Sequence, residues 1–302
     1  MDAQAWRRRR RFDGGAFPPE VLARRGADRI AVCLPARDEA ATVGGVLRPL
    51  VDLRDRGLVD RVVVADGGSR DDTAGVARAA GAEVLDTTAL QPGAGPVLGK
   101  GDTVWRALAE LDEEIVVWLD ADLEAVEDRW VSALAGPLLA DAEVQLVKGS
   151  FERPRLGAGE GAGRVTELTA RPLLLTFYPE LAVLRQPLSG QSAVRRAWAA
   201  EMPLPAGYGL EMAVLLETWS RGGLAAIAEC HLGTLLNRHQ PLERLVPMAV
   251  EVLDAVAQSL RAEGRLDAAA PAASLRAAGA VTARRPPVAG LEPARAAPGA
   301  RA

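Results

Sequence analysis

Strand-like and helix-like segments alternate through the first 120 residues of the chain. The short apolar runs are 29–36, 61–66, 82–86 and 115–119, and the segments with helical spacing between them are 38–53, 71–81 and about 102–111. An alternation of this kind predicts a parallel sheet with helices packed on its faces. We therefore expect an α/β fold whose ligands bind beyond the carboxyl ends of the strands.

Composition limits the class of protein. The chain has 302 residues, of which 49% are hydrophobic, enough for a sizeable core. With 36 basic and 40 acidic residues, its net charge of −4 argues against nucleic acid or an anionic membrane as a partner. The two cysteines, Cys33 and Cys230, provide neither a disulfide framework nor a cysteine metal site. No apolar stretch reaches the roughly 20 residues of a membrane helix, and none follows the N-terminal arginines, so we expect a soluble, cytoplasmic protein.

We divide the chain into four parts. Residues 1–14 contain a run of arginines and are predicted to be a flexible basic arm, and residues 15–140 form the strand-rich half. Residues 141–264 are less regular and end in an amphipathic helix from about 243 to 262. Residues 265–302 are rich in Ala, Arg, Pro and Gly, which cannot bury enough apolar surface to order a segment, so we predict a disordered tail.

Two aspartates follow the last of the predicted strands, in the sequence WLDADLE. If the strand continues, Asp120 and Asp122 point the same way, and a cation relieves the repulsion between their carboxylates. Mg²⁺ and Mn²⁺ are hard cations that take such oxygen ligands and leave positions for substrate phosphates. The alternative is that Asp120 begins a turn and Asp122 caps the next helix. Taken alone, the two aspartates are consistent with both interpretations.

Two further polar residues, Lys100 and Asp66, stand in loops that join the predicted strands and helices. Lys100 lies between two glycines just ahead of a helix, where backbone N–H groups and an ammonium can meet an anion. The loop is not a Walker P-loop, and DGGSRDDT lacks the dinucleotide-binding spacing. Asp66 can accept hydrogen bonds from a base or a ribose, although that motif alone favours a plain turn. Pro35, Asp66 and Asp120 are therefore expected to converge on one place.

Four segments resemble, in order and spacing, the nucleotide-sugar domain of GT-A glycosyltransferases: CLPARDEAATV, VVADGGSRDDT, GKGDTVWRAL and WLDADL. The later segments VKGSFERP, GAGRVTELTARPLL, QPLSGQSAVRR and PAGYGLEMAVLLET are similar to those of the glucosyl-3-phosphoglycerate synthases, a family of retaining enzymes. The resemblance runs from about residue 15 to 260. It implies a GT-A glycosyltransferase fold, a Rossmann-like and mostly parallel sheet flanked by helices, with a C-terminal acceptor-binding portion.

The resemblance also implies an activity, the transfer of glucose from UDP-glucose (or another NDP-glucose) to the 2-hydroxyl of 3-phospho-D-glycerate. It implies Mg²⁺ or Mn²⁺ as cofactor and a homodimer as the assembly. Two classes of alternative stay open. One is a related GT-A transferase, such as a mannosyl-3-phosphoglycerate synthase or a polyprenyl-phosphate glycosyltransferase. The other is a catalytically inactive nucleotide-sugar-binding protein.

Roles for individual residues follow from the same resemblance. The implied donor-binding residues are Pro35, Ala36, Glu39, Asp66, Lys100, Asp120, Gly190, Tyr208 and Glu211. The implied acceptor-binding residues are Gly163, Arg164 and Thr166, and the implied catalytic residues are Asp122, Glu211 and Lys100. Arginine suits an acceptor anion because its planar fork makes two hydrogen bonds to a phosphate or carboxylate. Taken alone, Arg164 is typical of a solvated charge and Glu211 of an acid in the first turn of a helix.

The metal site departs from the family at one position. Asp120 and Asp122 match two of the metal ligands, but Asn237 stands where the family has a metal-binding histidine, and the nearest imidazole is that of His239. Either the amide oxygen of Asn237 binds the metal, or His239 takes over the role from a shifted loop.

Overall fold

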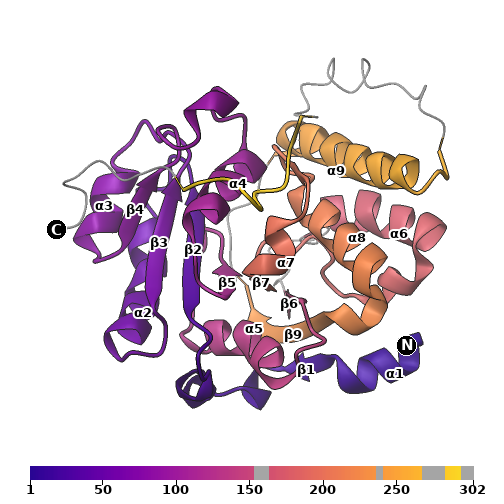
Figure 1. The fold of residues 1–302 in the computed structure, drawn as a ribbon, viewed down its shortest axis with the longest axis horizontal. Coiled ribbons are helices and arrows are strands. Elements are labelled where there is room, and N and C mark those ends of the chain that lie inside the picture. The colour runs from indigo at the N-terminus through magenta and orange to yellow at the C-terminus, as the bar shows by residue number, and fades with distance from the viewer. Residues whose placement is uncertain (153–162, 236–240, 267–282, 294–302) are drawn as a thin grey trace.

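An eight-stranded sheet runs through the molecule (Figure 1). The computed structural model describes residues 1–152, 163–235, 241–266 and 283–293. The spatial order of the strands is β1-β9-β6-β7-β5-β2-β3-β4, and β7 alone among these strands runs antiparallel to its neighbours. Their bounds are β1 Arg11–Asp13, β2 Ile30–Ala36, β3 Arg61–Asp66, β4 Glu83–Asp86, β5 Ile115–Trp118, β6 Leu146–Glu152, β7 Ser192–Arg195 and β9 Ile227–Thr234. A second, two-stranded sheet pairs β8 Leu204–Pro205 with β10 Arg284–Arg285.

Helices cover both faces of the large sheet. The α-helices are α1 Ala3–Arg9, α2 Val43–Asp55, α3 Thr73–Ala79, α4 Lys100–Glu110, α5 Arg129–Ala140, α6 Arg171–Phe177, α7 Arg196–Ala200, α8 Leu210–Gly222 and α9 Leu242–Ala262. Shorter helical turns are η1 Gly14–Ala16, η2 Pro19–Arg24, η3 Pro92–Ala94, η4 Thr166–Ala170, η5 Pro179–Val183 and η6 Gly223–Ala226. Successive side chains of β2 point to opposite faces of the sheet and enter two different hydrophobic cores. Ile30, Val32 and Leu34 pack with α2 and α5, whereas Ala31 and Cys33 pack on the side of α4, α8 and α9. The predicted α/β fold with a mostly parallel sheet is confirmed.

The helix predicted over 38–53 begins at Val43, five residues later than expected. The backbone N–H groups of Asp38, Glu39 and Ala40 instead donate to side-chain oxygens of Ser69, Thr73 and Asp71, at 3.0, 2.8 and 3.0 Å. Since these groups are satisfied outside a helix, the segment forms bends and turns before α2 begins, with Asp38 at a φ of +60°. It thereby ties the end of β2 to the loop that follows β3.

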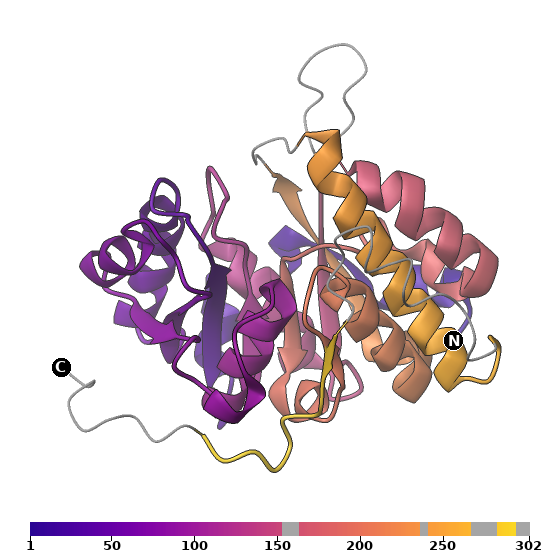
Figure 2. The same ribbon diagram turned by 90° about the horizontal axis from the view of Figure 1, so that it is seen from above.

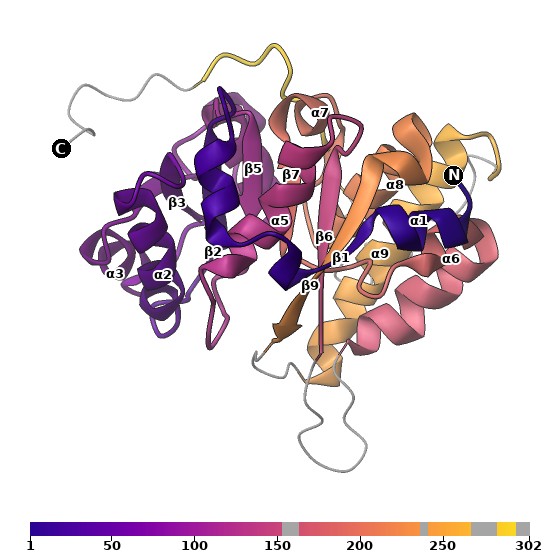
Figure 3. The same ribbon diagram turned by 90° about the horizontal axis from the view of Figure 1, so that it is seen from below.

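The prediction of a flexible arm over residues 1–14 is wrong. Trp6 of α1 is fully buried, and its indole N–H donates to the carbonyl of Ile227 at 2.7 Å. Strand β1 adds to the edge of the sheet in parallel with β9, as Figure 3 shows. Arg10 pairs with Asp141 and Glu143 at 2.6 and 2.5 Å. The run of arginines predicted a solvated segment, but the burial of the Trp6 side chain stabilises an ordered one.

The prediction of a disordered tail is wrong for the parts of residues 265–302 that the structure describes. Arg265 donates to the carbonyl of Phe177 at 2.7 Å. Residues 283–293 return to the body of the protein beside α4, where the indole N–H of Trp105 donates to the carbonyl of Pro286 at 2.6 Å (Figure 2). Val288 is buried there. Residues 267–282 and 294–302 lie outside the described part.

The two predicted halves of the chain share one sheet. Strand β5 belongs to residues 15–140 and pairs with β7, which belongs to residues 141–264. Both contribute side chains to the same cores. Among the described residues, the helices are all too short or too polar to cross a membrane.

Candidate active site

Three charged side chains meet where β5, α4 and α8 come together. The Nζ of Lys100 lies 2.7 Å from Oδ1 of Asp120 and 2.7 Å from Oε1 of Glu211. Burial alone would lower the pKa of Lys100, but the two carboxylates outweigh it and raise that pKa. Lys100 is therefore cationic throughout the physiological range. The acid of Glu211 lies in the first turn of α8, where the helix dipole favours it.

The two glycines beside Lys100 are required by close packing. A Cβ atom on Gly101 would lie 2.0 Å from the carbonyl oxygen of Pro205, and one on Gly99 would lie 2.9 Å from that of Ala206. The N–H of Asp102 donates to the Ala206 carbonyl at 2.9 Å. The chain after β8 thus lies directly against the start of α4. The Gly-Lys-Gly sequence therefore places Lys100 by allowing this contact.

Asp120 is held by two residues from the loop before β7. The amide of Gln191 donates to Oδ2 of Asp120 at 2.9 Å. A Cβ on Gly190 would lie 2.3 Å from the same oxygen, so the glycine makes room for the carboxylate. Strand β5 ends at Trp118, before the aspartates, so strand continuation does not orient them. The next helix, α5, has Asp128 and not Asp122 at its N-cap, which removes capping as the role of Asp122.

The donor set at this place consists of oxygen atoms, which suits Mg²⁺ or Mn²⁺. Asp120 and Asp122 are one residue apart in the turn after β5, and both are half-buried. Within the described residues, no three or more His, Cys, Asp or Glu side chains form a cluster that could hold a metal. Asn237 and His239, between which the sequence left the third ligand open, lie outside the described residues. The two aspartates fit a divalent cation that also takes ligands from elsewhere.

A pocket of about 540 Å³ of empty space, part of it open to solvent, lies beside this cluster. The polar and charged residues that line it are Lys100, Lys148, Ser192 and Glu211. Pro35, Trp118 and Gly190 line it as well. The rest of its wall is apolar: Val104, Leu108, Leu146, Val194, Ala199, Leu204, Leu210 and Val214. A few polar groups converging in a mostly apolar concavity are typical of small-molecule sites.

The predicted donor-binding residues of the first strands lie at one edge. Pro35 and Ala36 are at the end of β2, and Ala36 is opposite Asp66 in the register with β3. Oδ1 of Asp66 accepts from the N–H groups of Gly68 and Ser69 at 3.0 and 2.7 Å. Glu39 follows β2, and its Oε2 accepts from the Thr42 hydroxyl at 3.2 Å. Oδ1 of Asp66 therefore stabilises a turn, which is the role that the DGGSRDDT motif alone favoured.

Tyr208 stands at the entrance to α8, and α9 holds it there. Its backbone N–H donates to a carboxylate oxygen of Glu251, which is buried, whereas the Tyr208 side chain is 45% exposed. A Cβ on Gly209 would lie 2.8 Å from the carbonyl oxygen of Glu251. The predicted donor-binding tyrosine is thus presented on a fixed backbone close to Glu211.

The predicted acceptor-binding residues begin the helical segment formed by η4 and α6. Gly163 has a φ of +88°, in the left-handed region that favours glycine. Its carbonyl accepts from the N–H of Glu167 at 2.9 Å, which closes the first turn. Arg164 follows directly, and Thr166 is buried. These positions supply a guanidinium and a hydroxyl at a helix start, a setting that suits an anion.

Sequence reasoning missed Gln191 and Lys148. Lys148 and Lys100 are the two lysines of the chain, and both line the pocket. The side chain of Lys148 is buried, its Nζ donates to the carbonyl of Ser189 at 2.6 Å, and burial lowers its pKa to about 8. The scarcity of lysine in an arginine-rich chain was a signal that was available. Gln191 carried no such signal, because only the fold brings it to Asp120.

Known proteins are similar to this chain in sequence. Residues 31–155 match Glycosyl transferase family 2. The glucosyl-3-phosphoglycerate synthase of Mycolicibacterium smegmatis is 40% identical over 238 residues, which is 78% of each chain. That of Mycobacterium tuberculosis is 41% identical over 244 residues, 78% of this chain and 74% of the relative.

Solved structures are similar as well. The mannosyl-3-phosphoglycerate synthase from Rubrobacter xylanophilus has a TM-score of 0.83 at 40% identity, over 89% of this chain and 86% of that one. The Mycobacterium tuberculosis glucosyl-3-phosphoglycerate synthase in complex with Mn²⁺, UDP-glucose and phosphoglyceric acid has a TM-score of 0.75 at 40% identity, over 82% and 84%. By its sequence and its fold, the chain belongs to the glucosyl-3-phosphoglycerate synthase family of GT-A glycosyltransferases.

Proposed function

We propose that this protein is a retaining glucosyltransferase that moves glucose from UDP-glucose, or another NDP-glucose, to the 2-hydroxyl of 3-phosphoglycerate. The observation that carries the proposal is the contact of Lys100 with both Asp120 and Glu211 beside the pocket. This cluster joins the strand end expected to bind the metal to the helix expected to face the sugar. The relative from Mycobacterium tuberculosis binds the corresponding substrates.

The charges of the site suit the breaking of a glycosyl-diphosphate bond. Departure of UDP leaves negative charge on the diphosphate and a cation-like sugar. Two of the three N–H donors of Lys100 are used by the carboxylates, so one is left for a diphosphate oxygen. Asp120 and Asp122 would hold a Mg²⁺ or Mn²⁺ ion, which would supply Lewis-acid stabilisation of the same leaving group. Glu211 would orient the sugar, and its carboxylate would stabilise the positive charge that develops on the sugar.

Retention of configuration fits attack from the face that the diphosphate leaves. The departing phosphate oxygen can then take the proton of the acceptor hydroxyl, so no side chain needs to form a bond to the sugar. Arg164, with Gly163 and Thr166, would hold the phosphate or carboxylate of the acceptor. For the third protein ligand of the metal, we propose His239, through its imidazole, or Asn237, through its amide oxygen.

One assay tests this function. The purified protein is incubated with Mn²⁺ or Mg²⁺, 3-phosphoglycerate and each of a panel of NDP-sugars, and the product is identified by mass and by the anomeric coupling constant. We expect glucosyl-3-phosphoglycerate with the configuration of the donor. Binding of UDP-glucose without any transfer would instead indicate the inactive nucleotide-sugar-binding protein.

Mannosyl transfer is the second candidate. It is favoured by the 40% identity and the TM-score of 0.83 to the mannosyl-3-phosphoglycerate synthase from Rubrobacter xylanophilus. GDP-mannose therefore belongs in the panel, and a higher kcat/KM with GDP-mannose than with UDP-glucose would select this candidate.

We also propose that the enzyme works as a homodimer in the cytoplasm. Large apolar side chains are exposed on the segment of η4 and α6 and on α9: Leu168, Leu175, Leu242, Val246 and Leu253. Such exposure supports a surface that a second copy covers. Cys33 and Cys230 are both buried and free, which suits a reducing compartment. Sedimentation equilibrium tests the dimer, and Leu168→Glu with Leu175→Glu should yield monomers if these residues lie in its interface.

A further inference from the structure

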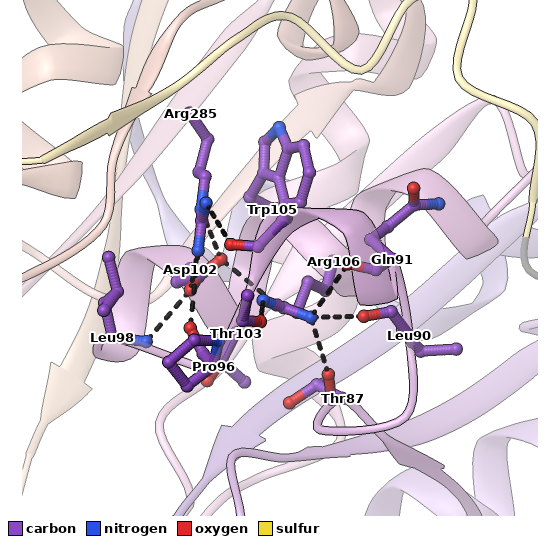
Figure 4. A network of polar contacts seen from close by, with 12 residues as sticks. Thr87, Leu90, Gln91, Pro96, Leu98, Asp102, Thr103, Trp105, Arg106 and Arg285 are labelled. Carbon is purple, nitrogen blue, oxygen red and sulfur yellow. Dashed lines mark hydrogen bonds and ion pairs between the residues drawn. The ribbon is translucent and has the colours of Figure 1, made fainter.

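Residues 283–293 bring one arginine to the start of α4. Arg285 makes a two-pronged ion pair with Asp102, with Nε 2.9 Å from Oδ1 and Nη2 2.7 Å from Oδ2. The side chain of Asp102 is fully buried, and that of Arg285 is 13% exposed. Figure 4 shows Arg285 and Arg106 approaching Asp102 from different sides. Pairs with this fork geometry are among the stronger and more directional contacts in proteins.

The same carboxylate organises the loop that precedes α4. Asp102 also accepts from Nε of Arg106 at 3.2 Å and from the N–H of Leu98 at 2.9 Å. Arg106 then donates to the carbonyl of Gly95 at 2.6 Å and to that of Leu90, and Arg285 donates to that of Ala94 at 2.7 Å. One buried carboxylate and two guanidinium groups thus close the loop of residues 87–98 onto the helix (Figure 4).

Asp102 lies two residues after Lys100 in the first turn of α4. Burial acts to raise the pKa of Asp102, but the hydrogen bonds from Arg285 and Leu98 and the charge of Arg106 outweigh it and lower that pKa. The carboxylate is therefore ionised inside the protein and depends on its partners. Without Arg285, the Asp102 carboxylate would have Arg106 as its remaining guanidinium partner. A buried charge with fewer partners favours rearrangement of the residues around it.

We propose that Arg285 is a positioning residue for the transfer reaction, acting through Asp102 to fix the first turn of α4 and hence the ammonium of Lys100. This inference rests on the proposed function, since it assigns Lys100 to the leaving diphosphate. Arg285 contacts Asp102, the carbonyls of Ala94 and Pro96, and the face of Trp105, whose ring centre lies 5.4 Å from its guanidinium carbon. None of these groups lines the pocket, so its effect is indirect.

Arg284 is a matched control on the same segment. Its guanidinium donates to the carbonyl of Pro203, just before β8, at 2.7 Å and pairs with Glu217 of α8 at 3.3 Å. It belongs to the same pairing of β10 with β8, opposite Pro205. A loss of activity seen with Arg285→Ala but not with Arg284→Ala is therefore assigned to the contact with Asp102 and not to the strand as a whole.

The kinetic test uses full-length Arg285→Ala, Arg285→Lys and Arg284→Ala. We expect Arg285→Ala to lower kcat by about ten- to hundredfold, because small misplacements of a catalytic group have effects of this size. KM for 3-phosphoglycerate should stay within about twofold, since the acceptor residues are on another element. Arg285→Lys keeps the charge but not the fork, and should restore part of kcat. Arg284→Ala should keep the wild-type kcat.

The decisive comparison repeats Arg285→Ala in a Lys100→Ala background. If Arg285 acts through Lys100, the second change has no further effect on kcat, because the group it positions is already absent. An undiminished fall in the double variant would overturn the proposal, as would a wild-type kcat for Arg285→Ala in the single variant. Thermal unfolding of each variant confirms that folded protein is being compared.

A measurement without turnover separates this inference from the proposed function. Amide hydrogen exchange of residues 100–103 should be faster in Arg285→Ala and Arg285→Lys than in wild type and Arg284→Ala. If the wild-type protein transfers no sugar but the exchange difference is seen, the proposed function fails while the positioning contact stands. Equal exchange in all four proteins would refute the positioning role whatever the activity.

Discussion

The ammonium of Lys100 lies 2.7 Å from carboxylates of both Asp120 and Glu211, residues 20 and 111 positions away along the chain. One cation between two anions leaves the cluster with a net negative charge. It also joins α4, the turn after β5 and α8 at a single atom. A change in any of the three residues is therefore expected to affect the other two.

Lys100→Met should lower kcat by about a hundredfold or more, because it removes a donor to the leaving diphosphate and leaves two carboxylates without their shared cation. Steady-state kinetics with UDP-glucose and 3-phosphoglycerate measures the effect. Arg221→Met, which removes a cation that pairs with Glu201 on the surface, is the control and should keep wild-type activity. Equal activity in the two variants would contradict the role of Lys100.

Asp120→Asn and Asp122→Asn should each abolish measurable transfer while the protein stays folded, since the lost charge acts on the cation and not on the core. Mn²⁺ binding, measured by electron paramagnetic resonance, should weaken in both variants. A chelator should abolish the transfer activity of the wild-type protein. Full activity of the double variant in chelator-treated buffer would refute the metal site.

Arg164→Ala should raise KM for 3-phosphoglycerate roughly a hundredfold and leave that for UDP-glucose nearly unchanged, because a charge-assisted contact to an anion contributes about 2 to 3 kcal/mol. Initial rates with each substrate varied in turn provide the two constants. Arg171→Ala is the control, since Arg171 pairs with Glu167 on the exposed side of the same segment. Equal damage to both substrates would remove Arg164 from the acceptor site.

Lys148→Met should stabilise the protein at pH 7 by about 1 to 3 kcal/mol, because the wild type holds a buried lysine whose charged form is disfavoured. Burial lowers the pKa of Lys148 from 10.5 to about 8, so between these values the unfolded state binds more protons than the folded state. Wild-type stability relative to the variant therefore rises with pH across that window, and the gain from Lys148→Met shrinks towards pH 10. Urea unfolding at pH 7 and pH 10 measures it, and a gain independent of pH would show that Lys148 is not the group responsible.

Local patterns in the sequence were sufficient for the parallel sheet and for one side of the site. The segments that became β2, β3 and β5 are short continuous apolar runs, and in a parallel sheet their carboxyl ends must meet at one edge. That placed Pro35, Asp66 and Asp120 correctly in one region. The glycines beside Lys100 were visible too, although the reason for them, the backbone of residues 205–207, was not.

Contacts between distant segments were decided only by the tertiary structure. Trp6 and Arg285 belong to stretches whose composition predicted disorder, yet one tryptophan finds a buried site against Ile227 and one arginine a buried carboxylate 183 residues away. Gln191 meets Asp120 across 71 residues. Composition averages over a window, whereas such contacts depend on single side chains that match partners which folding brings together. The periodicity of helices and strands depends on residues close together in the chain, so it can be predicted from the sequence. The fit between surfaces of distant segments depends on the folded structure and cannot be predicted in this way.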